Sequence, residues 1–176
     1  AEACAGCEVT RLSRRDDGFD VTDPASVDQH LVSLAGSFEE IIVATGILGS
    51  PEKSLGAITA AEMQRLFAVN TIGPALRVGS IGDNRIGGWH SYRASKAALN
   101  QIIHGAAIEL SRSHKGSVCV ALHPGTVQTE FTAKYAGRHK TMPAKDAAKS
   151  LLQVINGLTP EQTGGFYDYA GKPVSW

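Results

Sequence analysis

A long helix followed by a strand is predicted by residues 92–122, which read YRASKAALNQIIHGAAIELSRSHKGSVCVAL. Apolar side chains recur at helical intervals over residues 92–111, and residues 118–122 form the continuous apolar run of a strand buried on both faces. The predicted apolar face of the helix consists of Ala98, Leu99, Ile102, Ile103, Ala106 and Leu110. The stretch therefore predicts one helix–strand unit of an α/β fold.

Two similar units are predicted upstream. Apolar runs at residues 9–12 and 41–44 are typical of strands, and each is followed by a helix. An Asp-Pro pair of the N-cap type precedes the predicted helix at residues 25–34, and a Thr and a Glu with capping-box spacing open the helix that starts near residue 60. Because buried strands alternate with helices, the sequence predicts a parallel sheet covered on both faces, which binds ligands at the carboxyl ends of its strands.

The composition is ordinary for one soluble globular domain, which we expect to span residues 1–176. The chain is 43% hydrophobic and carries 17 basic and 17 acidic side chains. These charges balance and form no long block, so the sequence indicates neither a nucleic-acid nor a membrane surface. A small molecule is the expected partner.

The three cysteines are Cys4, Cys7 and Cys119. Cys4 and Cys7 form a C-x-x-C pair, but no second Cys/His pair at zinc spacing follows, so no metal site is predicted. Cys119 lies in an apolar run and is expected to be a buried small hydrophobe. Free thiols, without a signal peptide or an apolar run near 18 residues, predict a cytoplasmic protein.

Tyr92 and Lys96 form the pair with the clearest chemistry. Their spacing of four residues places both side chains on one face of the predicted helix, one turn of about 5.4 Å apart. A lysine cation close to a phenol favours the phenolate and lowers its pKa, which suits a tyrosine to general acid–base catalysis. The pair alone also fits two solvated side chains on an exposed helix.

Four motifs in order resemble the short-chain dehydrogenase/reductase family. Its Y-x-x-x-K motif matches residues 92–96, and its N-A-G segment matches residues 44–46 at the end of a predicted strand. The helical asparagine of the family matches Asn70, and its P-G-x-x-x-T loop matches residues 124–129. Residues 79–100 are similar to a bacterial subgroup related to the C-factor, or C-signal, protein.

This resemblance implies a Rossmann-like, doubly wound parallel sheet and hydride transfer between a nicotinamide cofactor and a small carbonyl or alcohol substrate. Tyr92 would be the proton donor, Lys96 would lower its pKa and hold the nicotinamide ribose, and Asn70 would anchor the proton relay. Residues 133–143 would cover the substrate. The implied cofactor contacts are Ser13, Arg14, Asp20, Val21, Ala44, Thr45, Gly46, Asn70, Tyr92, Lys96, Pro124, Gly125, Val127 and Thr129.

The cofactor preference depends on the end of the strand predicted at residues 9–12. An acidic residue there would bond the adenosine ribose hydroxyls, whereas this sequence has Ser13, Arg14 and Arg15. Because arginine forks suit phosphate, NADP(H) is the preferred cofactor and NAD(H) a possible one. Two solvated arginines are the alternative interpretation.

The sequence departs from the family pattern in two places. It contains no G-x-x-x-G-x-G turn, with which the family places the pyrophosphate on a helix N-terminus. The family also has about twenty further residues, enough for a helix and part of a strand, where Leu76 meets Arg77 here. We therefore expect a sheet that lacks the first strand and part of a central strand, and a sequence that joins segments of a longer chain.

Ser80 is the candidate for the serine that hydrogen-bonds the substrate carbonyl, because it precedes Tyr92 by twelve residues, close to the family spacing. In the C-factor-like subgroup this serine lies a few residues earlier, so Ser80 could instead cap a loop.

Two functions stay open. The first is an NADP(H)-dependent carbonyl reductase, and the second is a catalytically weak or inactive dehydrogenase-like protein that signals or binds a dinucleotide. A homo-oligomer, dimer or tetramer, is expected through the small residues of the 97–107 helix, as in the family.

Overall fold

The computed structural model describes residues 6–52, 54–72, 87–129 and 141–176. Its helices and strands follow the alternating order that the sequence predicts. In chain order they are α1 (Pro24–Val32), η1 (Leu55–Ala57), α2 (Ala60–Phe67), η2 (Ala68–Ile72), α3 (His90–Ser113), β1 (Ala121–His123), β2 (Val127–Gln128), β3 (Met142–Pro143), α4 (Ala144–Gly157), η4 (Pro160–Gln162) and β4 (Phe166–Asp168).

The named strands pair in parallel, as predicted. β1 pairs with β4 in the register Ala121 to Phe166, and β2 pairs with β3 in the register Val127 to Met142. The strand predicted at residues 118–122 thus begins three residues later, at Ala121. The fold is of the Rossmann type that the sequence predicts, and the described residues contain part of its parallel sheet.

The predicted strands at residues 9–12 and 41–44 are wrong for this structure, which assigns neither segment to a named strand. Their apolar side chains are also not buried: Val9 is 48% exposed, Ile41 78% and Ile42 52%. A central strand is buried only when strands flank it on both edges and helices cover both faces. The part of the chain that the structure describes has no strands that flank residues 9–12 or 41–44. Val9, Ile41 and Ile42 therefore stay exposed.

Both predicted helix starts are confirmed. The Asp23 carboxylate accepts a hydrogen bond from Ala25 N at 3.0 Å, with Pro24 in the first turn of α1. The Thr59 hydroxyl accepts from Glu62 N at 3.2 Å and caps α2. A side chain that satisfies a first-turn amide is the usual reason for a helix to begin at such residues.

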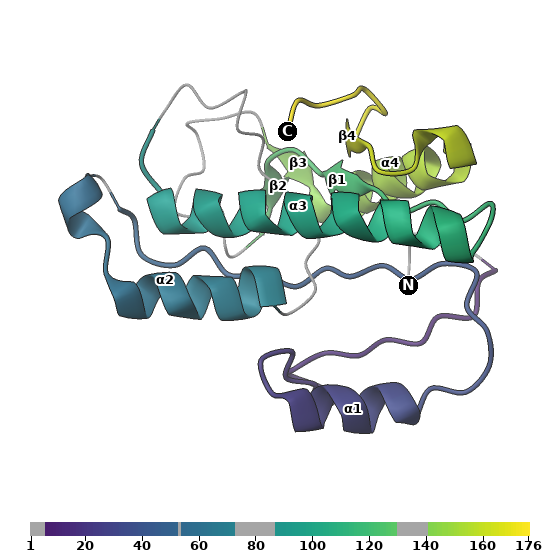
Figure 1. Cartoon of the computed structure of the whole chain (residues 1–176), viewed down its shortest axis with the longest axis horizontal. Coiled ribbons are helices and arrows are strands. Elements are labelled where there is room, and N and C mark those ends of the chain that lie inside the picture. Colours follow the sequence, from purple (N-terminus) through teal and green to yellow (C-terminus); the bar gives the residue numbers. More distant parts are fainter. Residues whose placement is uncertain (1–5, 53, 73–86, 130–140) are drawn as a thin grey trace.

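Helix α3 is the longest helix of the described ranges and lies alongside α2, with the short strands and α4 on its other side (Figure 1). It begins and ends two residues beyond the predicted bounds of 92–111. Its buried residues are Ser91, Ser95, Lys96, Leu99, Asn100 and Ala107. The predicted apolar face is therefore wrong in part, because Ile102 is 53% exposed, whereas small hydroxyl side chains occupy buried positions of the first turns.

A small apolar cluster joins α3 to the strands. It consists of Leu99 from α3, Ala121 from β1 and Phe166 from β4, with Ile103 and Val174 packed against it. Burying these side chains fixes the face of α3 that meets the β1–β4 pair.

The cysteines differ from the prediction of free thiols. Cys7 is disulfide-bonded, whereas Cys119 is free and half-buried, and burial raises the pKa of its thiol. No helix in the described ranges is long and apolar enough to cross a membrane. The same ranges hold no group of His, Cys, Asp and Glu side chains that could bind a metal ion.

Candidate functional site

Tyr92 and Lys96 lie together in the first two turns of α3, as their spacing predicts. The Lys96 Nζ atom lies over the Tyr92 ring, 5.7 Å from its centroid. Lys96 is fully buried, with 0% of its surface exposed, and Tyr92 is half-buried. An ammonium held inside the protein interacts with its neighbours more strongly than a solvated one, because water screens it less.

Asn70 is also fully buried, and its amide binds the backbone of the segment that follows Gly46. Its Oδ1 accepts a hydrogen bond from Ile47 N at 2.8 Å, and its Nδ2 donates to Ile47 O at 2.9 Å. The same Nδ2 donates to Ser95 Oγ at 3.2 Å. A π-helical turn, η2, carries Asn70 at the end of α2, a type of turn that is frequent at functional sites.

Gly46 completes this cluster. A Cβ atom built on Gly46 would lie 3.2 Å from Asn70 Oδ1 and 3.3 Å from Lys96 Nζ. The glycine therefore lets the backbone come close to both side chains, and any larger residue would press against them. Gly46, Asn70 and the Tyr92/Lys96 pair, which lie far apart in the sequence, meet at one place in the fold.

Hydroxyl groups tie the first turns of α3 to this cluster. Ser95 Oγ donates to Tyr92 O at 2.7 Å, and Thr71 Oγ1 donates to Ser95 O at 2.8 Å. Ser95 is fully buried and Thr71 nearly so. The backbone of Tyr92 is thus fixed through Ser95 to η2, the turn that carries Asn70.

A buried carboxylate at the start of α3 was not predicted from the sequence. Glu52 is 4% exposed, and both of its carboxylate oxygens accept hydrogen bonds from Ser91, the residue before Tyr92. No motif marks Glu52, which stands in a loop. The one hint in the sequence is the spacing of Ser91 and Ser95, which places two hydroxyl groups on one face of the helix and so indicates a polar contact there.

The predicted adenosine contacts lie in the loop before α1. Arg14 forms an ion pair with Asp20 at 3.2 Å, although the arginine side chain is 78% exposed. Hydrogen bonds from Thr22, with the Arg14 charge nearby, hold the pKa of Asp20 below its usual value. Ser13 N donates to Asp17 Oδ2 at 2.7 Å, which folds the loop on itself. The structure thus brings Arg14 and Asp20 together, next to Val21.

The predicted loop at residues 124–129 turns sharply at Gly125, whose φ of +70° favours glycine. Gly125 N donates to His123 Nδ1 at 2.8 Å, so that ring nitrogen is an acceptor. Val127 is buried in the short strand β2 rather than in a loop, and Thr129 follows it. The segment leaves the carboxyl end of β1, where the fold predicts a ligand.

Some predicted features lie outside the residues that the structure describes. These are Ser80, the junction of Leu76 with Arg77, and residues 133–140 of the expected substrate cover.

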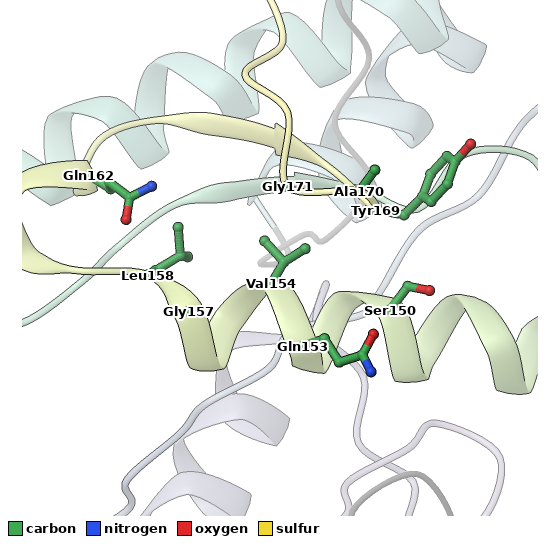
Figure 2. A pocket seen from close by; sticks show the side chains of 9 residues that line it. All are labelled: Ser150, Gln153, Val154, Gly157, Leu158, Gln162, Tyr169, Ala170 and Gly171. Carbon is green, nitrogen blue, oxygen red and sulfur yellow. The ribbon is translucent and has the colours of Figure 1, made fainter.

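One cavity is lined by residues that the sequence did not single out. It has a volume of about 360 Å³ and is lined by α4 and by the loop after β4 (Figure 2). Val154 points from α4 toward Gly171 of this loop, and a Cβ on Gly171 would lie 3.7 Å from Val154. None of the predicted site residues lines this cavity, but Tyr169, which does, lies against Gly125: a Cβ at Gly125 would lie 3.0 Å from Tyr169 Cε1.

Several curated proteins are similar to this chain. C-signal from Myxococcus xanthus is 37% identical over 145 residues, which cover 70% of this chain and 84% of C-signal. The 1-hydroxy-2-glutathionyl-2-methyl-3-butene dehydrogenase of a Rhodococcus species is 31% identical over 182 residues, which cover 90% of this chain and 79% of that enzyme. No protein-family profile matches the chain.

A solved structure is similar as well. The NADPH-bound carbonyl reductase from chicken fatty liver superposes with a TM-score of 0.79 at 26% identity, over 90% of this chain and 75% of that one. The Rhodococcus match extends over 182 residues, more than the 176 of this chain. That relative therefore has residues inside the aligned region that this chain lacks.

Proposed function

Because the chain belongs to the short-chain dehydrogenase/reductase family, we propose that it is an NADP(H)-dependent oxidoreductase that reduces a carbonyl compound to an alcohol, or catalyses the reverse reaction. The observation that carries this proposal is the cluster of Gly46, Asn70, Tyr92 and Lys96, in which the Lys96 cation is buried beside a phenol. Relatives named as dehydrogenases and a carbonyl reductase support an oxidoreductase.

In this proposal Tyr92 donates a proton to the oxygen of the carbonyl substrate. The buried Lys96 cation favours the phenolate that remains, and a general acid placed in this way contributes about 10²–10⁴-fold to a rate. When bound, the nicotinamide supplies the hydride that the carbonyl carbon accepts. A serine would hold the carbonyl oxygen, and Ser80 is the candidate that the sequence offers.

In this proposal the nicotinamide ribose binds beside Gly46. A Cβ at this position would lie 3.3 Å from Lys96 Nζ, so the backbone of Gly46 lies against the lysine that would hold the ribose. Ala44 and Thr45 precede Gly46, and the Pro124–Gly125 turn leaves β1; these backbones would hold the cofactor. Asn70 would support the site by fixing Ile47 against α3, since its amide groups engage Ile47 and Ser95.

Arg14 supports the preference for NADP(H) over NAD(H). Its guanidinium is mostly exposed and could bind a 2′-phosphate while Asp20, its ion-pair partner, stays near the adenine. The NADPH carried by the chicken carbonyl reductase supports the same preference.

The test is cofactor binding followed by turnover of the full chain. NADPH is expected to raise the melting temperature more than NADH at equal concentration, by mass action on the folded state. Reduction of 4-nitrobenzaldehyde, an electron-poor aldehyde, is then followed through the loss of NADPH absorbance. Tyr92→Phe is expected to abolish this turnover and to keep the NADPH-induced shift. Turnover that survives in Tyr92→Phe, or no shift with either cofactor, would refute the proposal.

A second candidate function rests on the similarity to C-signal. In that case the chain would be a catalytically weak or inactive dehydrogenase-like protein that signals or binds a dinucleotide. It predicts an NADPH-induced shift without turnover of any aldehyde in a broad panel, and without an effect of Tyr92→Phe on the shift.

Self-association and a cytoplasmic location stay predictions. Two apolar side chains of α3, Ile102 and Ile108, are 53% and 43% exposed, which is compatible with a partner along this helix. Light scattering of the purified chain would give its number of subunits.

A further inference from the structure

Glu52 makes an unusual set of contacts for a loop residue. It lies 39 positions before Ser91, yet its Oε2 accepts from Ser91 N at 2.7 Å and its Oε1 accepts from Ser91 Oγ at 2.6 Å. Its backbone oxygen accepts from Trp89 N at 3.0 Å. Three hydrogen bonds therefore join one loop residue to the start of α3.

These contacts replace a cap that the helix does not supply itself. The N-cap residue of α3 is Trp89, whose side chain makes no capping hydrogen bond. Trp89 has a left-handed φ of 56°, a conformation that is costly for a residue with a Cβ. Glu52 satisfies the amide of Ser91 and that of Trp89, so it both caps the helix and holds the left-handed entry in place.

The surroundings of Glu52 stabilise its buried carboxylate. A carboxylate in a residue that is only 4% exposed is stable when hydrogen bonds or charges compensate the loss of water, and here both oxygens are bonded at the positive end of the helix dipole. Gly88 leaves space for the loop, because a Cβ at Gly88 would lie 3.0 Å from Glu52 O. The loop and the helix entry therefore fit each other closely.

We propose that Glu52 is a positioning residue for Tyr92, and this rests on the proposed function, in which Tyr92 is the proton donor. Tyr92 directly follows Ser91, and its own carbonyl accepts from Ser95 Oγ at 2.7 Å. Glu52 thus fixes the residue before Tyr92, and Ser95 fixes the turn after it. Small displacements of a reacting group can cost about 10²-fold in rate.

The segment at residues 46–52 links this cap to the cofactor side of the site. It runs along α3 toward the N-terminus of that helix (Figure 1). At one end Gly46 and Ile47 lie against Lys96 and Asn70, and at the other end Glu52 holds Ser91. One loop therefore contacts both the lysine and the residue that precedes the tyrosine.

The test compares Glu52→Ala with Glu52→Gln in the full chain, assayed with NADPH and 4-nitrobenzaldehyde. Glu52→Ala is expected to lower kcat about 10- to 100-fold while KM for NADPH stays within about twofold. Glu52→Gln should recover most of kcat, because its amide can accept from Ser91 N and donate to Ser91 Oγ. Thr59→Ala, which removes the cap of α2 instead of that of α3, is the control and should keep kcat within about twofold.

Two further measurements separate positioning from general damage. In a double-mutant cycle, Ser91→Ala should lower kcat in the wild-type chain but have no further effect in Glu52→Ala, since the bond between them is then already lost. Hydrogen exchange should show that Glu52→Ala loses protection at the Ser91 amide while the middle of α3 stays protected. This exchange readout does not depend on turnover, so it tests the cap even if the chain reduces no aldehyde.

The outcomes are distinct. Unchanged kcat in Glu52→Ala, an equal loss of kcat in Thr59→Ala, or full additivity with Ser91→Ala would overturn the positioning role. If Glu52→Ala does not fold, then failure of the near-isosteric Glu52→Gln to support turnover would overturn it as well. An inactive wild-type chain with an intact exchange effect would instead count against the proposed function alone.

Discussion

The Lys96 Nζ atom lies 5.7 Å from the centroid of the Tyr92 ring, and Lys96 is completely buried. The two residues stand one turn apart on α3, so the helix itself sets their distance. Gly46 of a neighbouring segment lies against the ammonium, since a Cβ on this glycine would lie 3.3 Å from Lys96 Nζ. A charge in this position is expected to act on the phenol and on whatever binds beside the glycine.

Lys96→Met is the first prediction. Methionine is similar in length and fills the same buried space without a charge, so the fold should persist. Without the cation the Tyr92 phenolate loses its stabilisation, and turnover with NADPH and 4-nitrobenzaldehyde should fall by about 10²-fold or more. Steady-state kinetics and a thermal melt check both parts. A Lys96→Met enzyme with wild-type turnover would remove Lys96 from the mechanism.

Asn70→Ala should destabilise the chain. It leaves Ile47 N and Ile47 O without their side-chain partners in a part-buried position, and an unsatisfied buried group costs about 1–3 kcal/mol. Denaturant unfolding would measure this loss. Asn70→Asp tests the donor alone: its carboxylate can still accept from Ile47 N but cannot donate to Ile47 O, so we expect this variant to be destabilised too. If both variants unfold like the wild type, Asn70 does not fix this segment.

Gly46→Ala tests whether the close approach of the Gly46 backbone to Lys96 matters for cofactor binding. The added Cβ would lie 3.2 Å from Asn70 Oδ1 and 3.3 Å from Lys96 Nζ, so these side chains must shift by a few tenths of an ångström. We expect a raised KM for NADPH with a melting temperature close to that of the wild type. Gly56→Ala is the control, because a Cβ at Gly56 meets no atom within 4 Å. Equal effects of the two substitutions on KM would show that the Gly46 site does not hold the cofactor.

The local signals in the sequence predicted the helices well and the sheet poorly. Asp23 and Thr59 cap α1 and α2 as expected, because capping depends on groups a few residues apart. Ile41 and Ile42 have the pattern of a buried strand but are exposed, because burial of a strand depends on neighbours that are distant in sequence.

In the candidate site, too, local contacts could be predicted and contacts between distant residues could not. The Tyr92/Lys96 spacing follows from helix geometry and could be predicted, and the family resemblance added Gly46 and Asn70. The bond between Glu52 and Ser91 spans 39 positions and involves no motif, so no local pattern could reveal it. Likewise, the ion pair of Arg14 with Asp20 depends on how the loop before α1 folds.

His30 should make the stability of the chain depend on pH. Its Nδ1 lies 2.7 Å from Ser26 O and its Nε2 lies 3.0 Å from Asp17 O. Only the imidazolium can donate to both carbonyl oxygens, and these bonds, that to Ser26 first, raise the pKa of His30 above its usual value. A raised pKa in the folded state means that folding favours the protonated ring.

The sign of the pH effect follows from this linkage. The stabilisation is fully present below the pKa of an unfolded histidine, about 6.5, and is lost as the pH rises through the higher pKa of the folded state. The melting temperature of the wild type should therefore exceed that of His30→Gln most at acidic pH, and the difference should shrink toward alkaline pH. An NMR titration of the His30 ring gives the independent check, since a midpoint at or below about 6.5 would contradict the proposed bonds.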